Sequence, residues 1–322
     1  MLKYLIIQLD DTSVSFCHYN ARSAKVGLIP QTILEEALFW SMKENLTVQF
    51  TYPNYELSNE YKESISHVFH VDIVSSTCED SELRSKADVV VFDSLSSIQD
   101  YPFSSEQSYV FRGTLNELVE NSMMISSILP NVSRINIVVT DVPSFTKENQ
   151  LKYEAFLTNI SHKIADEYQR DHGVQFNVLT DRILLDNMNN CNAGVESITL
   201  CPDGKFYICP AFYNDTADRY SVGNLKDGLD IKNSQLYRID HAPICRICDA
   251  FHCRRCVWLN RKMTLEVNTP SHEQCVMAHI ERNASRTLLS HIREIGQFLP
   301  EKEIPELTYL DPFNKLINNS DE

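Results

Sequence analysis

Glycine is scarce in this chain, which contains eight glycines among 322 residues. Between Met1 and Arg112 the sole glycine is Gly27. Glycine-rich loops let backbone amides approach a phosphate group closely, so they mark many nucleotide sites. The first third of the sequence has no segment of that kind.

Positive charge and long apolar runs are also limited. Lys and Arg number 29 against 44 Asp and Glu, a formal net charge of −15. Such an acidic surface repels phosphate backbones, so we expect no nucleic-acid partner. No window approaches the roughly 18 consecutive apolar residues of a membrane span. The short apolar run at the N-terminus is followed at once by Asp10 and Asp11, unlike a secretory signal. We therefore expect a cytoplasmic protein with no membrane span.

Cysteine, in contrast, is abundant and grouped. Eight of the ten cysteines lie in one stretch, and four of these form two C-x-x-C pairs separated by four residues. In a reducing compartment, grouped cysteines indicate a metal site more often than disulfides or packed thiols. Thiolates suit zinc or the iron of iron-sulfur clusters best. The candidate metal ligands are Cys191, Cys201, Cys209, Cys245, Cys248, Cys253, Cys256 and Cys275.

The first 180 residues alternate between strand-like and helix-like patterns. Strands are expected at 3–9, 47–51, 71–74, 87–92, 135–140 and 174–178, and helices at 31–45, 60–69, 115–129 and 147–170. Six strands separated by helices predict an α/β fold with a mostly parallel sheet, either an open doubly wound sheet or an incomplete barrel.

The pattern changes after residue 180. Turn signals at 202–204, 223–224 and 226–228 predict hairpins around a metal, and helical character returns over 272–299. We expect domains at 1–182 and 183–299, and a C-terminal tail at 300–322 that is extended or disordered.

The cysteine spacing resembles the SPASM domain of radical S-adenosylmethionine (radical SAM) peptide-modifying enzymes. In that family a cysteine precedes a glycine by nine to fifteen residues, and a second cysteine follows after four more. Cys191, Gly204 and Cys209 fit this pattern, and a four-cysteine run and a last isolated cysteine follow here as in the family. The later gaps of that run are four and two residues here, whereas the family usually has five and three.

The resemblance implies two auxiliary 4Fe-4S clusters. Cys191, Cys209 and Cys256 would hold the first cluster, with Cys201 as a possible fourth ligand. The second would be held by Cys245, Cys248, Cys253 and Cys275. Eight thiolates match two fully ligated clusters. A zinc ribbon would use four of them, usually with a longer gap between its pairs.

The same resemblance implies a partial (β/α)6 barrel over residues 1–182, but its cofactor motifs are degenerate. A radical SAM core has C-x3-C-x2-C after the first strand, and only Cys17 remains here, preceded by Phe16. Where the family has Gly-Gly-Glu-Pro, this chain reads 50–53 Phe-Thr-Tyr-Pro. One thiolate cannot hold a cluster that must also chelate S-adenosylmethionine, so the resemblance implies that this cosubstrate is not bound.

The chain thus combines an N-terminal segment, residues 1–182, that lacks the cofactor motifs with a C-terminal segment, residues 183–299, that keeps the auxiliary-cluster cysteines. This combination resembles the pseudo-radical-SAM proteins of peptide maturation, and in particular the CXXX repeat peptide maturases. The likeness lies in residues 4–19, which read Tyr-Leu-Ile-Ile-Gln-Leu-Asp-Asp-Thr-Ser-Val-Ser-Phe-Cys-His-Tyr. It implies an iron-sulfur protein that binds a ribosomally made precursor peptide or a catalytic partner. Two alternatives stay open: an active maturase that uses an auxiliary cluster, and a zinc-binding interaction module.

Outside the cysteines, no residue set stands out as catalytic or as binding another cofactor. Asp10 and Asp11 could form a carboxylate pair at a strand end, but turn capping is the simpler interpretation. The aromatic group of Tyr52, Tyr55 and Tyr61 could fill the lost cosubstrate pocket or offer a peptide-docking surface.

Overall fold

The computed structural model describes residues 2–20, 26–215, 220–296, 299 and 302–304 of the chain. Within them the strands form one sheet in the order β11-β10-β9-β8-β1-β2-β3-β4-β5-β6-β7. All neighbours from β8 to β7 are parallel, and β8 to β11 are antiparallel. The strands are β1 Tyr4–Gln8, β2 Thr47–Thr51, β3 His70–Ser75, β4 Val89–Phe92, β5 Ser108–Gly113, β6 Arg134–Val139, β7 Gln175–Phe176, β8 Ser197–Leu200, β9 Lys205–Tyr207, β10 Ser221–Asn224 and β11 Gly228–Leu229.

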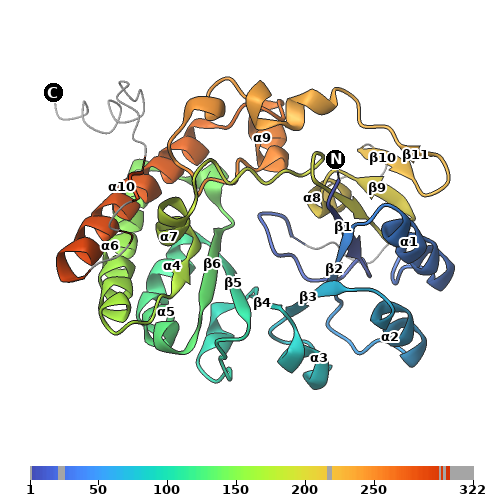
Figure 1. Ribbon diagram of the computed structural model, residues 1–322, viewed down its shortest axis with the longest axis horizontal. Coiled ribbons are helices and arrows are strands. Elements are labelled where there is room, and N and C mark those ends of the chain that lie inside the picture. The colour runs from blue at the N-terminus through green and yellow to red at the C-terminus, as the bar shows by residue number, and fades with distance from the viewer. Residues whose placement is uncertain (1, 21–25, 216–219, 297–298, 300–301, 305–322) are drawn as a thin grey trace.

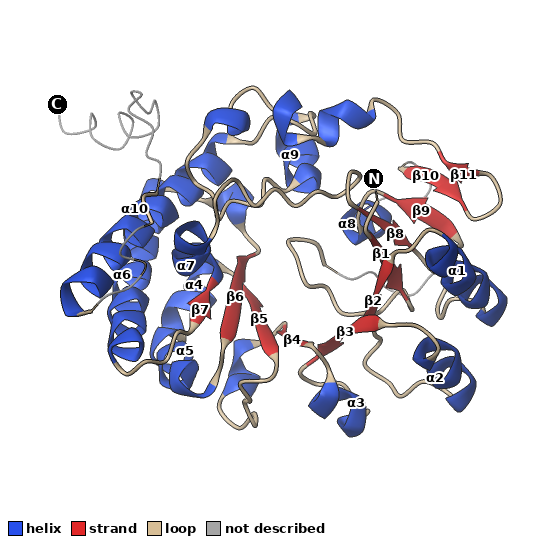
Figure 2. Cartoon of the chain, viewed as in Figure 1, coloured by secondary structure: helices blue, strands red, loops and turns tan. Residues whose placement is uncertain are grey.

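Most of the helices cover the outer side of this sheet, which runs as an arc in Figure 1. The helices of the described residues are α1 Gln31–Lys43, α2 Asn59–Ser66, α3 Ser81–Lys86, α4 Leu115–Glu120, α5 Ser122–Ile128, α6 Lys147–Gln169, α7 Asn177–Leu184, α8 Pro210–Asp215, α9 Val257–Thr264 and α10 His272–Ile295. The last helix, α10, lies along α6 and α7, and the segment containing α9 bridges from there toward β8 and β9 (Figure 2). No helix among the described residues is long and apolar enough to cross a membrane.

Local sequence explains these elements well. The parallel strands are short apolar runs whose residues are buried on both faces, as in β4, where Val90, Val91 and Phe92 have no exposed surface. The long helix α6 begins with a capping box, in which the Thr146 side chain and the Asn149 side chain each accept a backbone N–H of the other residue. Ser271 caps α10 by accepting the backbone N–H of Gln274 at 3.3 Å.

The predicted parallel sheet and the hairpins after residue 180 are confirmed. Strand β5 and helix α3 were not predicted. The strand expected at 174–178 is present but short: β7 pairs with β6 over Gln175–Phe176 only, and α7 begins at Asn177. The Asn177 side chain explains this early end, since its Oδ1 accepts the Ile137 N–H at 3.0 Å and its Nδ2 donates to the Ile137 carbonyl at 3.0 Å. The Asn177 side-chain amide thus makes the hydrogen bonds to β6 that the backbone of a longer β7 would make.

The expected helix at 115–129 is two helices, α4 and α5, that meet at Asn121. The turn expected at 223–224 was also wrong, because Gly223 and Asn224 lie inside β10. Helix α7 spans the expected domain boundary at 182, and β8 to β11 extend the same sheet as the front strands. The expected tail at 300–322 lies outside the described residues except for 302–304, where the Lys302 ammonium forms an ion pair with Asp186 at 3.0 Å.

Candidate metal centre

Four of the predicted ligands line one cavity of about 280 Å³. They are Cys245, Cys248, Cys253 and Cys275. The first two bracket a single 3-10 turn, Cys245–Ile247, and the last lies in the first turns of α10. Within the described residues, no three His, Cys, Asp or Glu side chains are gathered tightly enough to hold one metal ion. The four thiols therefore surround a space and do not meet at a point.

Backbone geometry holds these thiols in place. The Cys248 N–H donates to the Cys245 carbonyl at 3.1 Å, which closes the C-x-x-C turn. The Ala250 N–H donates to Cys248 Sγ at 3.4 Å, and His279 Nε2 of α10 lies 3.7 Å from the same sulfur. N–H donors that point at a cysteine sulfur stabilise its thiolate form, and they shift the reduction potential of a metal centre bound to that sulfur.

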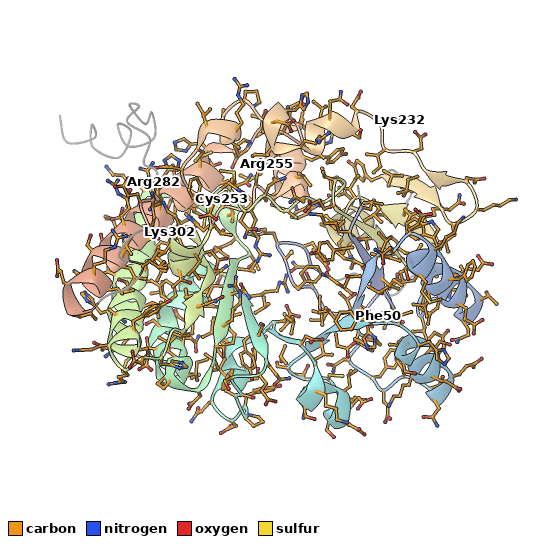
Figure 3. The ribbon with its side chains drawn as sticks, viewed as in Figure 1. Phe50, Lys232, Cys253, Arg255, Arg282 and Lys302 are labelled. Atoms are coloured by element: carbon orange, nitrogen blue, oxygen red, sulfur yellow. The ribbon has the colours of Figure 1, made fainter. Side chains whose placement is uncertain are left out.

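Arg255 brings a positive charge to the wall of this cavity. Its side chain is 2% exposed; Nε donates to Asn190 Oδ1 at 2.8 Å, Nη2 donates to the Tyr237 carbonyl, and buried Nη1 has no hydrogen-bond partner. Burial lowers the pKa of Arg255, and the charges of Cys245, Cys191 and Cys253 oppose this shift. Figure 3 labels Arg255 and Cys253 in the same part of the molecule. This guanidinium is placed to balance negative charge on the surrounding thiolates.

In the absence of a metal, burial favours the protonated form of two cavity thiols by raising their pKa values. It raises the pKa of Cys245 to about 11, although Arg255 acts in the opposite direction. It raises the pKa of Cys253 well above its usual value. A metal that binds here must therefore displace protons from these thiols, which a strong iron or zinc bond can do.

A buried ionic network ties the cavity to the rest of the fold. Asp249, which follows Cys248, is 3% exposed. Its Oδ1 accepts from Arg282 Nη1 of α10 at 3.0 Å, and its backbone carbonyl accepts from Arg182 Nε of α7 at 3.0 Å. The cysteine run, α7 and α10 are thereby held together by one carboxylate and two guanidinium groups.

Three of the other predicted ligands, Cys191, Cys209 and Cys256, lie away from this cavity. The Cys191 N–H donates to the Arg254 carbonyl at 2.8 Å, which places Cys191 beside the segment that carries Cys256. The charges of Cys256 and Cys191 raise the pKa of Cys209, after burial as the largest cause. These observations place Cys191, Cys209 and Cys256 in one region, and their assignment as ligands of one cluster stays a prediction.

Cys201 has different surroundings. It has no exposed surface and lies in the hydrophobic core. Its charge acts on the phenols of Tyr207 and Tyr213, whose pKa values are raised mainly by burial. The sequence had assigned it as a possible fourth ligand of the Cys191 group, and that assignment stays a prediction.

The carboxylates at the end of β1 are structural. Asp10 Oδ1 accepts the backbone N–H of Thr12 at 2.7 Å, and Asp11 Oδ2 accepts the backbone N–H of Val26 at 2.6 Å. Both aspartates are at most 4% exposed. The capping interpretation is therefore confirmed, with buried partners in place of the solvent that such caps usually contact.

The tyrosines near β2 divide in role. Tyr52 is 5% exposed and donates to Asp72 Oδ1 at 2.8 Å, so it fills the interior. Tyr55 is 40% exposed and donates to Asp10 Oδ2 at 2.9 Å. The sequence did not separate these two roles, because both residues follow the same strand.

A second cavity of about 290 Å³ lies at the carboxyl ends of β4, β5 and β6. Arg112 at the end of β5 lines this cavity and is 5% exposed. It forms an ion pair with Asp93, and its Nε donates to the Cys17 carbonyl at 2.7 Å. Ligand sites of parallel α/β sheets lie at this edge. Arg112 was missed in the sequence because its strand, β5, was not predicted.

No family model matches the sequence, and no curated protein matches it. Among solved structures, histidine-tagged anSMEcpe with bound AdoMet matches with a TM-score of 0.59 and 13% identity over 91% of this chain and 100% of that chain. Native anSMEcpe with bound AdoMet and Cp18Cys peptide matches with a TM-score of 0.57 and 14% identity over 92% and 100%. At such identities the match shows a shared fold.

Proposed function

We propose that this chain is an iron-sulfur protein of a ribosomal peptide maturation system. Its front, residues 1–182, is a degenerate radical SAM-like partial barrel, and residues 183–299 form a SPASM domain with two 4Fe-4S clusters. Its role is to bind a precursor peptide or a catalytic partner. The observation that carries this proposal is the single cavity lined by four cysteines at the predicted positions.

The residues present fit a cluster at this cavity. Four thiols supply the complete ligand set of one 4Fe-4S centre. The buried Arg255 side chain offers a positive charge, and the Ala250 N–H already donates to a ligand sulfur. Such a cluster, when bound, stores or passes single electrons. The chain's own residues hold the thiols, exclude water and link the site to α7 and α10 through Asp249.

A binding role is supported by the loop after β1. The Ser13 hydroxyl donates to the Thr51 carbonyl at 2.8 Å, and the Val14 N–H donates to the Tyr52 carbonyl at 3.0 Å. The loop is therefore bonded to the end of β2, at the edge where a parallel α/β fold would bind a small cosubstrate. Together with the loss of the three-cysteine motif, this favours a protein that does not bind S-adenosylmethionine.

An active maturase is the second candidate, and one observation favours it. The structural neighbour anSMEcpe was solved with AdoMet and a peptide bound, and this chain keeps a cavity of about 290 Å³ at its strand ends. The zinc-binding interaction module is the third candidate, because four thiols can also hold zinc.

The binding and enzymatic roles separate in one assay. Iron-loaded, reduced protein is incubated anaerobically with S-adenosylmethionine and a synthetic peptide that carries cysteine at every fourth position. We expect the peptide to bind and 5′-deoxyadenosine to stay at the level of a protein-free blank. Protein stripped of iron is the matched control for both readouts. Formation of 5′-deoxyadenosine above the blank would contradict the binding role and support the maturase.

A further inference from the structure

The inner face of the sheet carries an apolar cluster of its own. Side chains along a strand alternate between its two faces. One set of strand residues, such as Phe92 and Phe111, packs with helix residues into the main core. The other set forms a separate buried cluster, made of Ile73 of β3, Val91 of β4, Val110 of β5 and Val14. Val14 belongs to the loop after β1, so this loop covers the inner face of the sheet.

The loop lies inside the arc of the sheet, where Figure 1 draws it in blue. Val14 is 5% exposed and Val91 has no exposed surface, so little water reaches this cluster. Phe16 packs against the same cluster from the loop. Its ring meets that of Tyr19 edge to face, with 6.3 Å between the ring centroids, and Tyr19 is 3% exposed. Residues 13–20, which we call the plug, thus occupy the hollow of the sheet with their own side chains.

Three strands hold the plug by hydrogen bonds. At its start, the Val14 N–H donates to the Tyr52 carbonyl at 3.0 Å, just after β2. Near its other end, His18 Nδ1 lies 3.0 Å from the Val139 carbonyl of β6. Strand β5 supplies the remaining contacts through the side chain of Arg112. The plug is therefore held across the whole width of the inner face from β2 to β6.

Arg112 binds the plug through two of its nitrogen atoms. Its Nε donates to the Cys17 carbonyl at 2.7 Å. Its Nη2 donates to the Tyr19 carbonyl and to Asn20 Oδ1, and Nη1 donates to Asp93 outside the plug. The Arg112 side chain is 5% exposed, so loss of the plug would leave charged donors buried without acceptors, which is costly. Arg112 therefore holds the plug against the strand ends.

The plug leaves little room at the carboxyl ends of the strands. The cavity that remains there has a volume of about 290 Å³ and is lined by Asn20 of the plug together with Arg112. Pockets that enclose a drug-sized ligand span about 300 to 1,000 Å³. The remaining cavity lies at the lower limit of that range. A small cosubstrate would therefore find the edge where parallel α/β folds bind ligands already occupied.

We propose that residues 13–20 are a fixed plug, held by Arg112, that takes the place of a small cosubstrate on the inner face of the sheet. The proposal rests on the proposed function, since it gives the physical reason why the chain would bind a peptide or a partner without S-adenosylmethionine. Arg112 is a positioning residue, because it acts through the loop that it binds. A peptide or partner would then dock outside the arc of the sheet, because the inner side is filled.

Chymotrypsin tests the plug, because it cleaves after aromatic residues and both Phe16 and Tyr19 lie within residues 13–20. Wild type, Arg112→Met and Arg134→Met are digested under native conditions, and the rate at each cleavage site is followed by mass spectrometry. Phe111 has no exposed surface in β5, so cleavage after Phe111 reports opening of the whole sheet. The comparison of sites separates release of the plug from a general loss of stability.

Arg134→Met is the matched control, because Arg134 lies at the amino end of the neighbouring strand β6 and pairs with Asp181 at 2.9 Å. Native-state cleavage follows the population of the open form. In Arg112→Met we expect cleavage within the plug to accelerate about 100-fold over wild type, with a much smaller increase after Phe111. Asp93→Asn should accelerate it about tenfold, since Arg112 then keeps its bonds to the plug. Cleavage within the plug that is no faster in Arg112→Met than in Arg134→Met would overturn the proposal.

Measurements on wild type cover the case in which Arg112→Met fails to fold. Wild type should be cleaved after Phe16 and Tyr19 as slowly as after Phe111, with or without millimolar S-adenosylmethionine. Fast cleavage within the plug of the folded protein, or protection of the plug by S-adenosylmethionine, would overturn the proposal. Wild type that binds no iron would contradict the proposed function, whereas slow cleavage within the plug of that same protein would still support the plug.

Discussion

The buried carboxylate of Asp249 gives the sharpest test of how the cysteine-rich segment is held. Asp249→Asn keeps the size of the side chain but removes its negative charge. The carboxylate faces two guanidinium groups, Arg282 at 3.0 Å and Arg182 at 3.7 Å, and all three side chains are at most 6% exposed. Loss of one partner from a buried ion pair destabilises a protein by about 3 to 5 kcal/mol.

We expect the lower end of that range, because the asparagine oxygen can still accept one hydrogen bond. A loss of about 3 kcal/mol, with a urea dependence of about 3 kcal/mol per molar, moves the unfolding midpoint down by about 1 M. The assay is urea unfolding at pH 7 under anaerobic conditions, followed by circular dichroism and by visible absorbance.

Asp240→Asn is the matched control. Asp240 pairs with Arg238 at 3.8 Å, and their side chains are 66% and 60% exposed. An exposed pair contributes little, so we expect a change below about 0.5 kcal/mol. If the free energy of unfolding of Asp249→Asn differs from that of wild type by less than about 0.5 kcal/mol, as we expect only for Asp240→Asn, the buried network does not stabilise the fold.

Three further perturbations follow from the geometry. Gly223→Ala should destabilise the protein by at least about 2 kcal/mol in urea unfolding. Gly223 has φ +129°, and a Cβ at this position would lie 1.9 Å from the carbonyl oxygen of Gly228. Gly173→Ala is the control and should be neutral, because a Cβ there would have no atom within 4 Å. The hydrogen bond to Asp72 raises the pKa of His70 above 6.5. Its stabilisation is therefore fully present below about pH 6.5 and lost as the pH rises through the higher folded value. Wild type should lose up to about 1 kcal/mol more than His70→Gln between pH 6 and 8, and equal pH profiles would contradict this. Arg255→Met should lower the midpoint potential of a nearby cluster by roughly 50 to 100 mV in a redox titration. The magnitude follows because a unit charge ~8 Å from the cluster, at an effective dielectric constant of ~20, contributes ~2 kcal/mol. An unchanged potential would show that Arg255 does not act on the cluster.

The cysteine grouping was predictable because spacing along the chain limits which thiols can meet. Two C-x-x-C pairs four residues apart must lie close together, and Cys275 joins them because α10 begins just before it. The parallel sheet was predictable for a similar reason, since short apolar runs such as that of β4 suit strands buried on both faces.

The contacts between distant segments were not predictable. The position of Cys17 depends on Arg112, which is 95 residues away and lies on a strand that the apolar pattern did not reveal. The predicted strand at 174–178 ends early, at Phe176, because the Asn177 side chain pairs with β6 and α7 begins there. Tertiary hydrogen bonds of this kind override local preference, and one sequence does not display them.

We propose that the two cysteine groups bind two 4Fe-4S clusters. It is tested most directly by anaerobic purification followed by iron, sulfide and zinc analysis of wild type and Cys248→Ala. We predict about eight iron and about eight sulfide per wild-type chain, with no stoichiometric zinc, and about half of both in the variant. One or two zinc ions per chain without sulfide, or a Cys248→Ala protein with full iron content, would contradict the claim.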